Sequence, residues 1–276
     1  MNMATIFNQS QELPHIPRVV QELIESFQNE DVDVDELSSK VSLDQVLTAK
    51  VLRLANSAHY GVPRTVANTN DAIMLLGFNT LRTMVLASGV TSSFKAPEGF
   101  DKNAFWKEAF AIGALAKWLA PYVQGADKET AFTCGMLHSI GSLLIRMVMP
   151  AEAISIDEAE AMGGKRHSLE QGQLGFDYAQ VGAELAKRWK FPEEMQNAIA
   201  EQNNPEKDEE FGVYGGILFI AKYLHQAHKD DWKDERIIEE FPLAVAQKIG
   251  MDAEKAYQDV AATTDLESGL DSLLDD

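Results

Sequence analysis

The chain has 276 residues, of which 45% are apolar and 24% are charged, a balance typical of folded globular proteins and not of disordered ones. Its 24 basic and 43 acidic residues give a formal net charge of −19. Such a charge repels nucleic acid and anionic bilayers, so we expect neither as a partner. Residues 1–98 contain 7 basic and 11 acidic residues and have a net charge of −4, so residues 99–276 have a net charge of −15.

The N-terminal residues lack the basic and apolar regions of a secretory signal peptide. No apolar run approaches the roughly 18 residues that cross a bilayer. We therefore expect a cytoplasmic protein. The single cysteine, Cys134, lies among apolar residues, where we expect it to pack in the core.

Apolar residues recur at helical spacing along most of the chain, and no comparable stretch alternates with the period of two typical of strands. One helix is expected to bury Leu43, Val46, Leu47, Val51, Leu54 and Ala58 and to end near Gly61. Later helices are expected over 80–93, 105–119, 130–149, 177–189, 211–228, 234–249 and 252–263, with a capping box at Asp177 and Gln180. The sequence thus predicts an all-α fold.

A Pro/Gly stretch at 95–99 is the best candidate for a domain boundary. We expect two helical subdomains, residues 1–98 and residues 99–264. The acidic tail, residues 265–276, is expected to be disordered. Alternatively, its leucines Leu270, Leu273 and Leu274 dock on a partner as a short amphipathic helix.

Several strings resemble the HDOD (HD-related output domain) family of bacterial signalling proteins. These strings lie at 13–17 (LPHIP), 41–61 (VSLDQVLTAKVLRLANSAHYG), 72–77, 105–106, 135–141 (GMLHSIG) and 174–189, so the resemblance spans about 12–225. It implies an N-terminal helical subdomain followed by a second one that resembles the helical fold of HD phosphohydrolases.

An HD hydrolase holds one or two divalent metals with several His and Asp side chains, and these metals activate a water and clamp a phosphoryl oxygen. At the positions that match its ligands, this chain has Glu108, His138, Ser139, Tyr178, Gln202, Asn203 and Lys222. A divalent metal needs several deprotonated donors, and a serine supplies no carboxylate. The resemblance therefore implies a vestigial pocket formed by these seven residues, with no catalytic residue, no metal and no cofactor.

Three side-chain assignments stay open at this point. His138 could bond to Ser139, Tyr178 or a backbone group, or it could line a pocket that holds a ligand other than metal. Arg53, Arg64 and Arg82 could form a contact for an anion or an acidic partner. Alternatively, the polar residues late in the first helix, Arg53 among them, satisfy its terminal carbonyl groups. His225 and His228 are expected on the surface.

The main functional expectation is a non-catalytic signal-transduction or scaffolding module that binds a regulatory protein or a small nucleotide. The alternative is an atypical metal-dependent phosphohydrolase that uses Glu108, His138 and Asp177. A helix-turn-helix DNA reader is disfavoured, because the helix that begins near residue 80 offers only Arg82 to neutralise phosphates.

Overall fold

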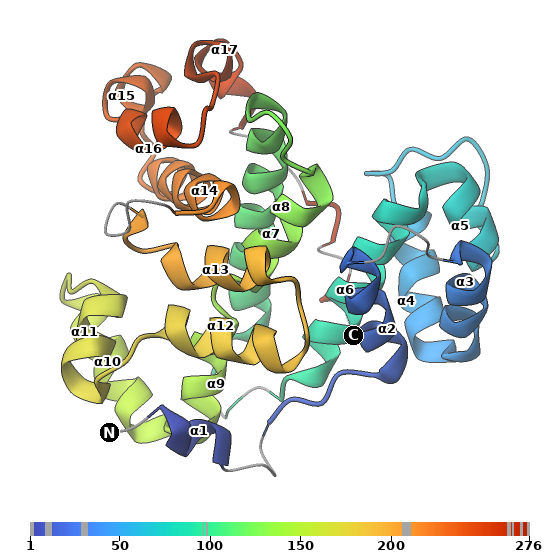
Figure 1. Ribbon diagram of the computed structural model, residues 1–276, viewed down its shortest axis with the longest axis horizontal. Coiled ribbons are helices and arrows are strands. Elements are labelled where there is room, and N and C mark those ends of the chain that lie inside the picture. Colours follow the sequence, from blue (N-terminus) through green and yellow to red (C-terminus); the bar gives the residue numbers. More distant parts are fainter. Residues whose placement is uncertain are drawn as a thin grey trace.

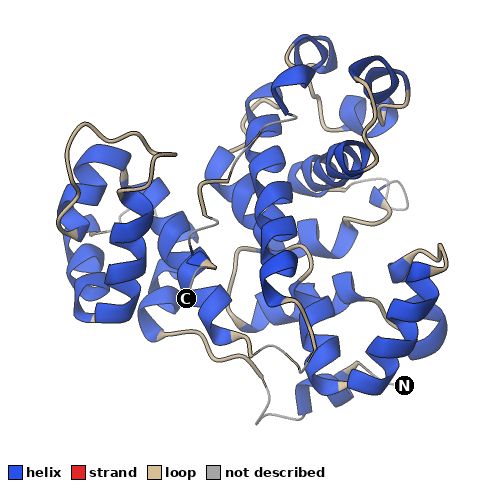
Figure 2. Cartoon of the chain, turned by 180° about the vertical axis from the view of Figure 1, so that it is seen from behind, coloured by secondary structure: helices blue, strands red, loops and turns tan. Residues whose placement is uncertain are grey.

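The computed structural model describes residues 3–8, 13–28, 33–95, 97, 99–205, 211–263, 266, 268–270 and 273–274. Within these ranges every regular element is an α-helix or a short 3-10 helix, as Figure 2 shows. The predicted all-α fold is therefore confirmed.

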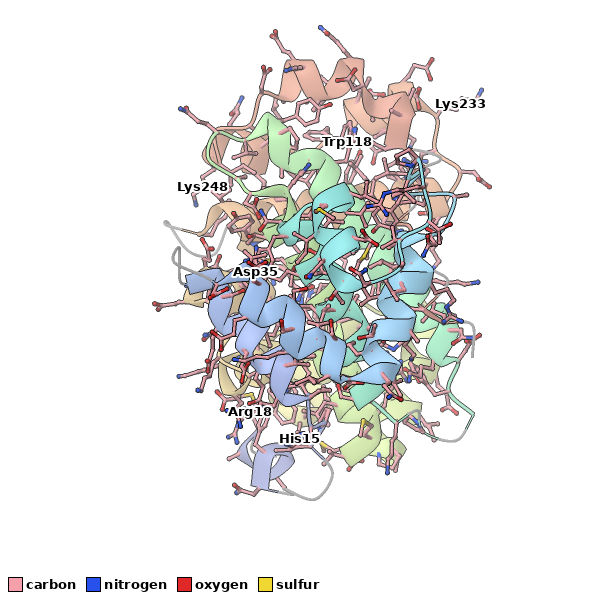
Figure 3. The ribbon with its side chains drawn as sticks, turned by 90° about the vertical axis from the view of Figure 1, so that its right-hand side faces the viewer. His15, Arg18, Asp35, Trp118, Lys233 and Lys248 are labelled. Carbon is pink, nitrogen blue, oxygen red and sulfur yellow. The ribbon has the colours of Figure 1, made fainter. Side chains whose placement is uncertain are left out.

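Five helices form a group on one side of the molecule (Figure 1): α2 (Arg18–Glu25), α3 (Val34–Leu43), α4 (Gln45–Ala55), α5 (Thr69–Leu76) and α6 (Phe78–Ser93). Figure 3 faces this group, with Arg18 and Asp35 on its outer surface. Asp33, Asp44 and Asn68 accept bonds from backbone N–H groups three residues on, and so start α3, α4 and α5. Helix α6 packs against α2, α4 and α5 and continues the core into the rest of the molecule.

The larger group of helices surrounds a central pair, α7 (Lys102–Leu119) and α8 (Lys128–Leu137). A Cβ atom on Gly135 of α8 would lie 2.5 Å from Cα of Gly113 of α7, so the two backbones touch. The other helices are α9 (Ile140–Val148), α10 (Pro150–Ala161), α11 (Arg166–Leu174), α12 (Tyr178–Arg188), α13 (Glu193–Glu201), α14 (Val213–Lys229), α15 (Asp234–Glu239), α16 (Leu243–Lys248) and α17 (Ala253–Gln258). The predicted capping box at Asp177 and Gln180 is present at the start of α12.

The helix expected over 130–149 is divided into α8 and α9 by a turn at His138 and Ser139. The backbone N–H of His138 bonds to the carbonyl of Gly135, three residues back, which tightens the chain as in a 3-10 turn. The apolar periodicity continues through this turn and therefore does not reveal it. The break places two polar side chains at the junction of two buried helices.

The helix expected from Leu43 to Ala58 is also divided, because Asp44 ends α3 and caps α4. Leu43 is 84% exposed and Val46 is 69% exposed, so the prediction that they share the buried face was wrong. Leu47, Val51 and Leu54 are buried as expected, whereas Ala58 is exposed, because α4 ends at Ala55 and not near Gly61. In the same way, Pro242 separates α15 from α16 within the helix expected over 234–249.

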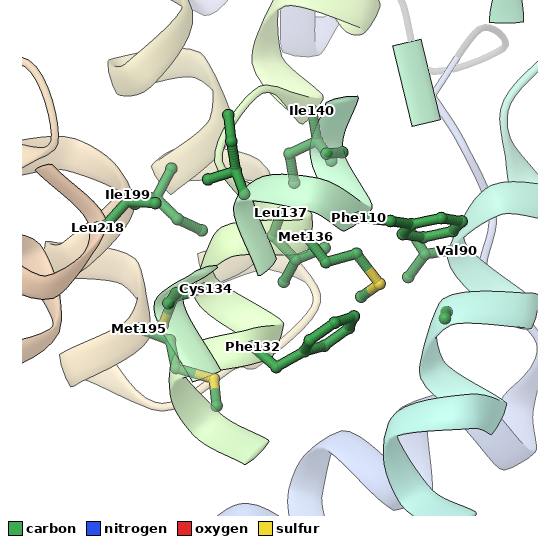
Figure 4. Packing of buried hydrophobic residues seen from close by; sticks show 14 of the residues in the cluster. Val90, Phe110, Phe132, Cys134, Met136, Leu137, Ile140, Met195, Ile199 and Leu218 are labelled. Carbon is green, nitrogen blue, oxygen red and sulfur yellow. The ribbon is translucent and has the colours of Figure 1, made fainter. Parts of the chain in front are cut away.

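The buried apolar residues form one continuous cluster across both groups of helices. Figure 4 labels Val90 of α6 and Phe110 of α7 among its members, and neither is exposed to solvent. Helix α1 (Ala4–Asn8) precedes α2 in the chain but packs on α9 of the larger group, and the guanidinium of Arg188 lies 4.4 Å from the ring centre of Phe7. Helix α1 of the first predicted subdomain thus contacts the larger group of helices.

The acidic tail also differs from expectation where the structure describes it. Leu270, Leu273 and Leu274 are 1%, 4% and 8% exposed and belong to the core cluster. Gly269 lies against the ring of His59. The leucines are buried because three apolar side chains in a short segment gain more from packing than the segment loses in conformational freedom.

The stretch 128–148 is long and apolar enough, by length and composition, to cross a membrane. Of its 18-residue apolar window, 78% is buried inside the molecule, and the turn at His138 divides the stretch into two helices. We therefore assign it to the core.

Candidate functional site

A cavity of about 580 Å³ opens where α8 meets α9. Helices α7, α9, α10, α11, α12 and α14 all contribute to its walls. Five residues of the predicted vestigial pocket line it: Glu108, His138, Ser139, Tyr178 and Lys222. The other two, Gln202 and Asn203, do not line the cavity and instead bond to the side chain of Lys222. The structure thus brings the seven residues together.

His138 lies at the end of α8, where its ring is buried. Its Nδ1 atom lies 2.7 Å from the carbonyl oxygen of Gly135, so this nitrogen carries the proton and donates. Burial lowers the pKa of His138 to about 3, and the nearby charge of Lys222 acts in the same direction. The ring is therefore neutral near pH 7, and of the alternatives left open above, the bond to a backbone group is the one observed.

The side chain of Lys222, on α14, lies at the centre of the predicted residues. Its ammonium donates to the hydroxyl of Tyr178 at 2.9 Å, to Oε1 of Gln202 at 3.0 Å and to Oδ1 of Asn203 at 2.7 Å. The Tyr178 hydroxyl in turn donates to Oδ1 of Asn203 at 2.8 Å. Burial lowers the pKa of Lys222 to about 7, although the negative charges of Asp177 and Glu108 oppose this shift.

Gln202 connects this lysine to the turn that holds His138. Its Nε2 atom donates to the carbonyl oxygens of His138 at 2.7 Å and Ile199 at 2.8 Å. The side chain is completely buried at the end of α13. Gln202 therefore fixes Lys222 and the backbone of His138 relative to each other.

These residues do not fit a divalent cation. The oxygen atoms around Lys222 belong to a phenol and two amides, and the ammonium already occupies the centre of the set. A metal placed beside it would meet like-charge repulsion and would lack the deprotonated donors it needs. Glu108 is half-exposed and lies 4.0 Å from Lys229. In the described part of the chain, no group of three or more His, Cys, Asp or Glu side chains is arranged to hold a metal.

A charged network on α9, α10 and α11 forms another wall of the cavity, and the sequence analysis missed it. Asp157 pairs with both Arg146 and Arg166, and Arg166 also contacts Glu160 at 2.9 Å and Glu170 at 2.9 Å. The i,i+4 spacing of Arg166 and Glu170 is a local signal that could have indicated their pair. The pairs with Asp157 depend on the fold and have no such signal.

Glu170 joins this network to the start of α12. Its Oε2 atom accepts a bond from the backbone N–H of Tyr178 at 2.6 Å. Burial raises the pKa of Glu170 to about 7, although the charge of Arg166 opposes the shift. This carboxyl therefore helps to position Tyr178.

The three arginines of the predicted anion contact, Arg53, Arg64 and Arg82, differ in their surroundings. Arg82 is 8% exposed, and its guanidinium lies 3.7 Å from the ring centre of Phe27. Arg64 is paired with Asp71 at 2.7 Å, whereas Arg53 is exposed. Helix α6 places Arg82 in the interior, where aromatic rings lie against its guanidinium.

Asn56, at the end of α4, donates from its side chain to the carbonyl oxygen of Leu52 at 2.7 Å and so satisfies a terminal carbonyl of the helix. Its side chain donates to the carbonyl oxygen of Val66 at 2.9 Å and accepts from the backbone N–H of Val66 at 2.7 Å. The polar residue at this terminus therefore holds the following loop in place.

Comparison with known proteins identifies relatives of this chain. The HDOD domain family matches residues 13–205. A crystal structure of a provisionally named phosphohydrolase from Shewanella amazonensis SB2B is 36% identical and covers 99% of this chain and 100% of its own, with a TM-score of 0.84. An uncharacterized protein of Treponema pallidum (strain Nichols) is 26% identical over 211 residues, which are 75% of this chain and 41% of that protein.

Two more distant structures share the fold. An HDOD domain protein of unknown function from Geobacter sulfurreducens is 20% identical, covers 98% of this chain and 97% of its own, and has a TM-score of 0.78. A provisionally named signal transduction protein from Marinobacter aquaeolei VT8 is 22% identical, covers 98% of this chain and 61% of its own, and has a TM-score of 0.80. The arrangement of helices is thus shared at low sequence identity.

Proposed function

Because this chain belongs to the HDOD family, we propose that it is a non-catalytic signal-transduction or scaffolding module that binds a regulatory protein or a small nucleotide. Its partners are neither nucleic acid nor a membrane surface, in keeping with the net charge of −19, and it works in the cytoplasm. The signalling role is supported by the name of the Marinobacter protein, which shares the fold.

One observation carries the non-catalytic part of the proposal. An HD hydrolase needs a metal cation where its ligands converge, and here the ammonium of Lys222 lies among the matching residues. A lysine supplies positive charge but has no open coordination position at which a water could be activated. A site of this kind is suited to binding and not to metal-assisted hydrolysis.

The second candidate is an atypical phosphohydrolase. Glu108 and His138 line the same cavity, and the 36% identical Shewanella protein carries a provisional phosphohydrolase name. Asp177, the third residue of this candidate, accepts from the backbone N–H of Gln180 at 3.0 Å and caps α12. Because this carboxylate is occupied as a helix cap, a catalytic role for Asp177 is disfavoured.

Metal analysis separates the two candidates. The full chain, purified without a histidine tag, is analysed for bound metals by mass spectrometry and assayed against phosphomonoesters and phosphodiesters with added Mn²⁺, Mg²⁺ or Zn²⁺. We expect substoichiometric metal and no turnover above the buffer. Stoichiometric metal together with hydrolysis that His138→Ala abolishes would establish the phosphohydrolase instead.

A further inference from the structure

The hydrogen-bond partners of the Lys222 ammonium are all uncharged, unlike those of the paired arginines that line the cavity. Its three hydrogen bonds go to a phenol and two amides. Across the described ranges, no carboxylate oxygen lies within ion-pair distance of its ammonium, and the charges of Asp177 and Glu108 act on it only from farther away. Proteins rarely enclose a charge without a countercharge, because desolvation is costly.

The carboxylates that line the cavity are engaged elsewhere. Asp157 and Glu160 pair with arginines, and Glu108 lies nearest to Lys229. Asp101 accepts from the backbone N–H of Ala104 at 2.9 Å and caps α7. Since none of these side chains supplies a countercharge for Lys222, its positive charge can attract an anion in the cavity, although its three N–H donors already bond to Tyr178, Gln202 and Asn203.

We infer that the cavity binds an anionic small molecule, and that Lys222 is the countercharge for its phosphate-like group. This inference rests on the proposed function, because it takes the cavity as a ligand site without metal. Ser139 and Ser142 also line the cavity and can donate hydroxyl bonds to an anion, and Phe105 offers an apolar ring. The volume of about 580 Å³ is in the range of small-molecule sites.

Binding of an anion beside Lys222 stabilises the ammonium and therefore raises the pKa of this side chain. The titratable groups that face Lys222 are Asp177 and Tyr178 of α12, Glu108 of α7, His138 at the end of α8 and His225 of α14 itself. Because Lys222 loses its proton near pH 7, anion affinity falls as the pH rises above that value. Between about pH 6 and about pH 8.5, the affinity should fall about thirty-fold if only the ammonium binds.

The first test uses inorganic sulfate, which keeps its charge over this pH range. Side-chain NMR of protein with labelled lysines follows the Lys222 amine, assigned with Lys222→Arg, in sodium sulfate and in sodium chloride at equal ionic strength. We expect sulfate, and not chloride, to raise the pKa of Lys222. An unchanged pKa in saturating sulfate would overturn the inference without requiring a variant that folds.

The second test compares adenosine 5′-monophosphate with adenosine, which lacks the phosphate. Calorimetry should detect binding of the nucleotide to the wild-type chain, at least tenfold weaker binding to Lys222→Met, and little binding of adenosine. Lys187→Met, which removes an exposed lysine outside the cavity, is the matched control and should bind as the wild type does. Equal affinity of the wild type and a folded Lys222→Met variant would exclude Lys222 as the countercharge.

Failure of the anion site can be distinguished from failure of the proposed function. If sulfate and the nucleotide fail to bind while metal and turnover are also absent, only the anion site is refuted. If stoichiometric metal and hydrolysis are found, the proposed function fails first, and the anion site fails with it.

Discussion

Gln202 is a single buried side chain on which the geometry of the site depends. Its amide donates to the His138 and Ile199 carbonyl oxygens and accepts from Lys222. We expect Gln202→Ala to lower the free energy of unfolding by about 1–3 kcal/mol, because it leaves buried polar groups without partners. Urea denaturation measures the loss. Gln173→Ala, at an exposed position of α11, should change stability little, and equal losses in the two variants would contradict this role for Gln202.

Glu170 should give the stability of the chain a distinct pH dependence. Its pKa is raised from 4.5 to about 7 in the folded state, so the native protein binds a proton that the unfolded chain releases in this interval. The contribution of Glu170 to stability is therefore greatest below pH 4.5 and declines as the pH rises to about 7, by about 3 kcal/mol at most.

We expect Glu170→Gln to remove this decline, so that its stability relative to the wild type improves between about pH 4.5 and about pH 7. Denaturant titrations across this range measure the difference. Glu160→Gln changes a more exposed carboxylate that also pairs with Arg166 and should keep the decline caused by Glu170. Parallel stability curves for the wild type and Glu170→Gln would refute the assignment.

At the scale of residues, the seven pocket positions could be predicted because the family resemblance aligned them with one ancestral site. Their hydrogen bonds could not be predicted, since these depend on side chains from α12, α13 and α14 that meet only in the folded chain. The pairing of Asp157 with Arg146 and Arg166 was missed for the same reason.

At the scale of elements, the contact between α9 and α12 places Tyr178 in the site. A Cβ atom on Gly141 would collide with the carbonyl oxygen of Tyr178 and lie 2.5 Å from the backbone nitrogen of Gly182. Gly141→Ala should therefore separate the helices and lower the free energy of unfolding by about 1–3 kcal/mol. It should also weaken the bond between Tyr178 and Lys222, which the side-chain NMR signal of Lys222 would report.

Gly172→Ala provides the matched control for this contact. Gly172 also lies within a helix, but a Cβ atom there would meet no other atom within 4 Å. Alanine favours the helix over glycine by about 1 kcal/mol, so this variant should be slightly more stable than the wild type. Thermal unfolding of both variants distinguishes a steric effect from a general effect of alanine. Equal melting temperatures would show that the helices can adjust.

The helical type of the elements followed from apolar periodicity, but the periodicity did not reveal where several helices end, and so it underestimated their number. The core face continues from α8 into α9 through the turn at His138, so the pattern of apolar residues does not change there. In contrast, Asp44 is a recognisable N-cap residue, and it could have indicated the boundary between α3 and α4.

At the scale of the whole molecule, the two groups of helices are joined by polar contacts in addition to the apolar core that they share. The carboxylate of Glu129 on α8 is 2% exposed and accepts from Thr83 of α6 at 2.9 Å and from Lys117 of α7 at 2.7 Å. The sequence predicted two subdomains because the Pro/Gly stretch at 95–99 interrupts the helices. A composition pattern of this kind marks a change of direction and does not show whether the segments on either side share a core.

The leucines of the tail are buried in the structure, whereas the sequence alone indicated a disordered segment. A substitution in the tail distinguishes these two descriptions. Leu270 is 1% exposed, so Leu270→Ala should lower the free energy of unfolding by about 2–5 kcal/mol through lost burial and an unfilled cavity. Leu243→Ala removes a leucine that is 44% exposed and should cost much less. Chemical denaturation of the full-length variants measures both losses. If the two substitutions prove equally mild, the tail is free in solution and the leucines do not hold it in the core.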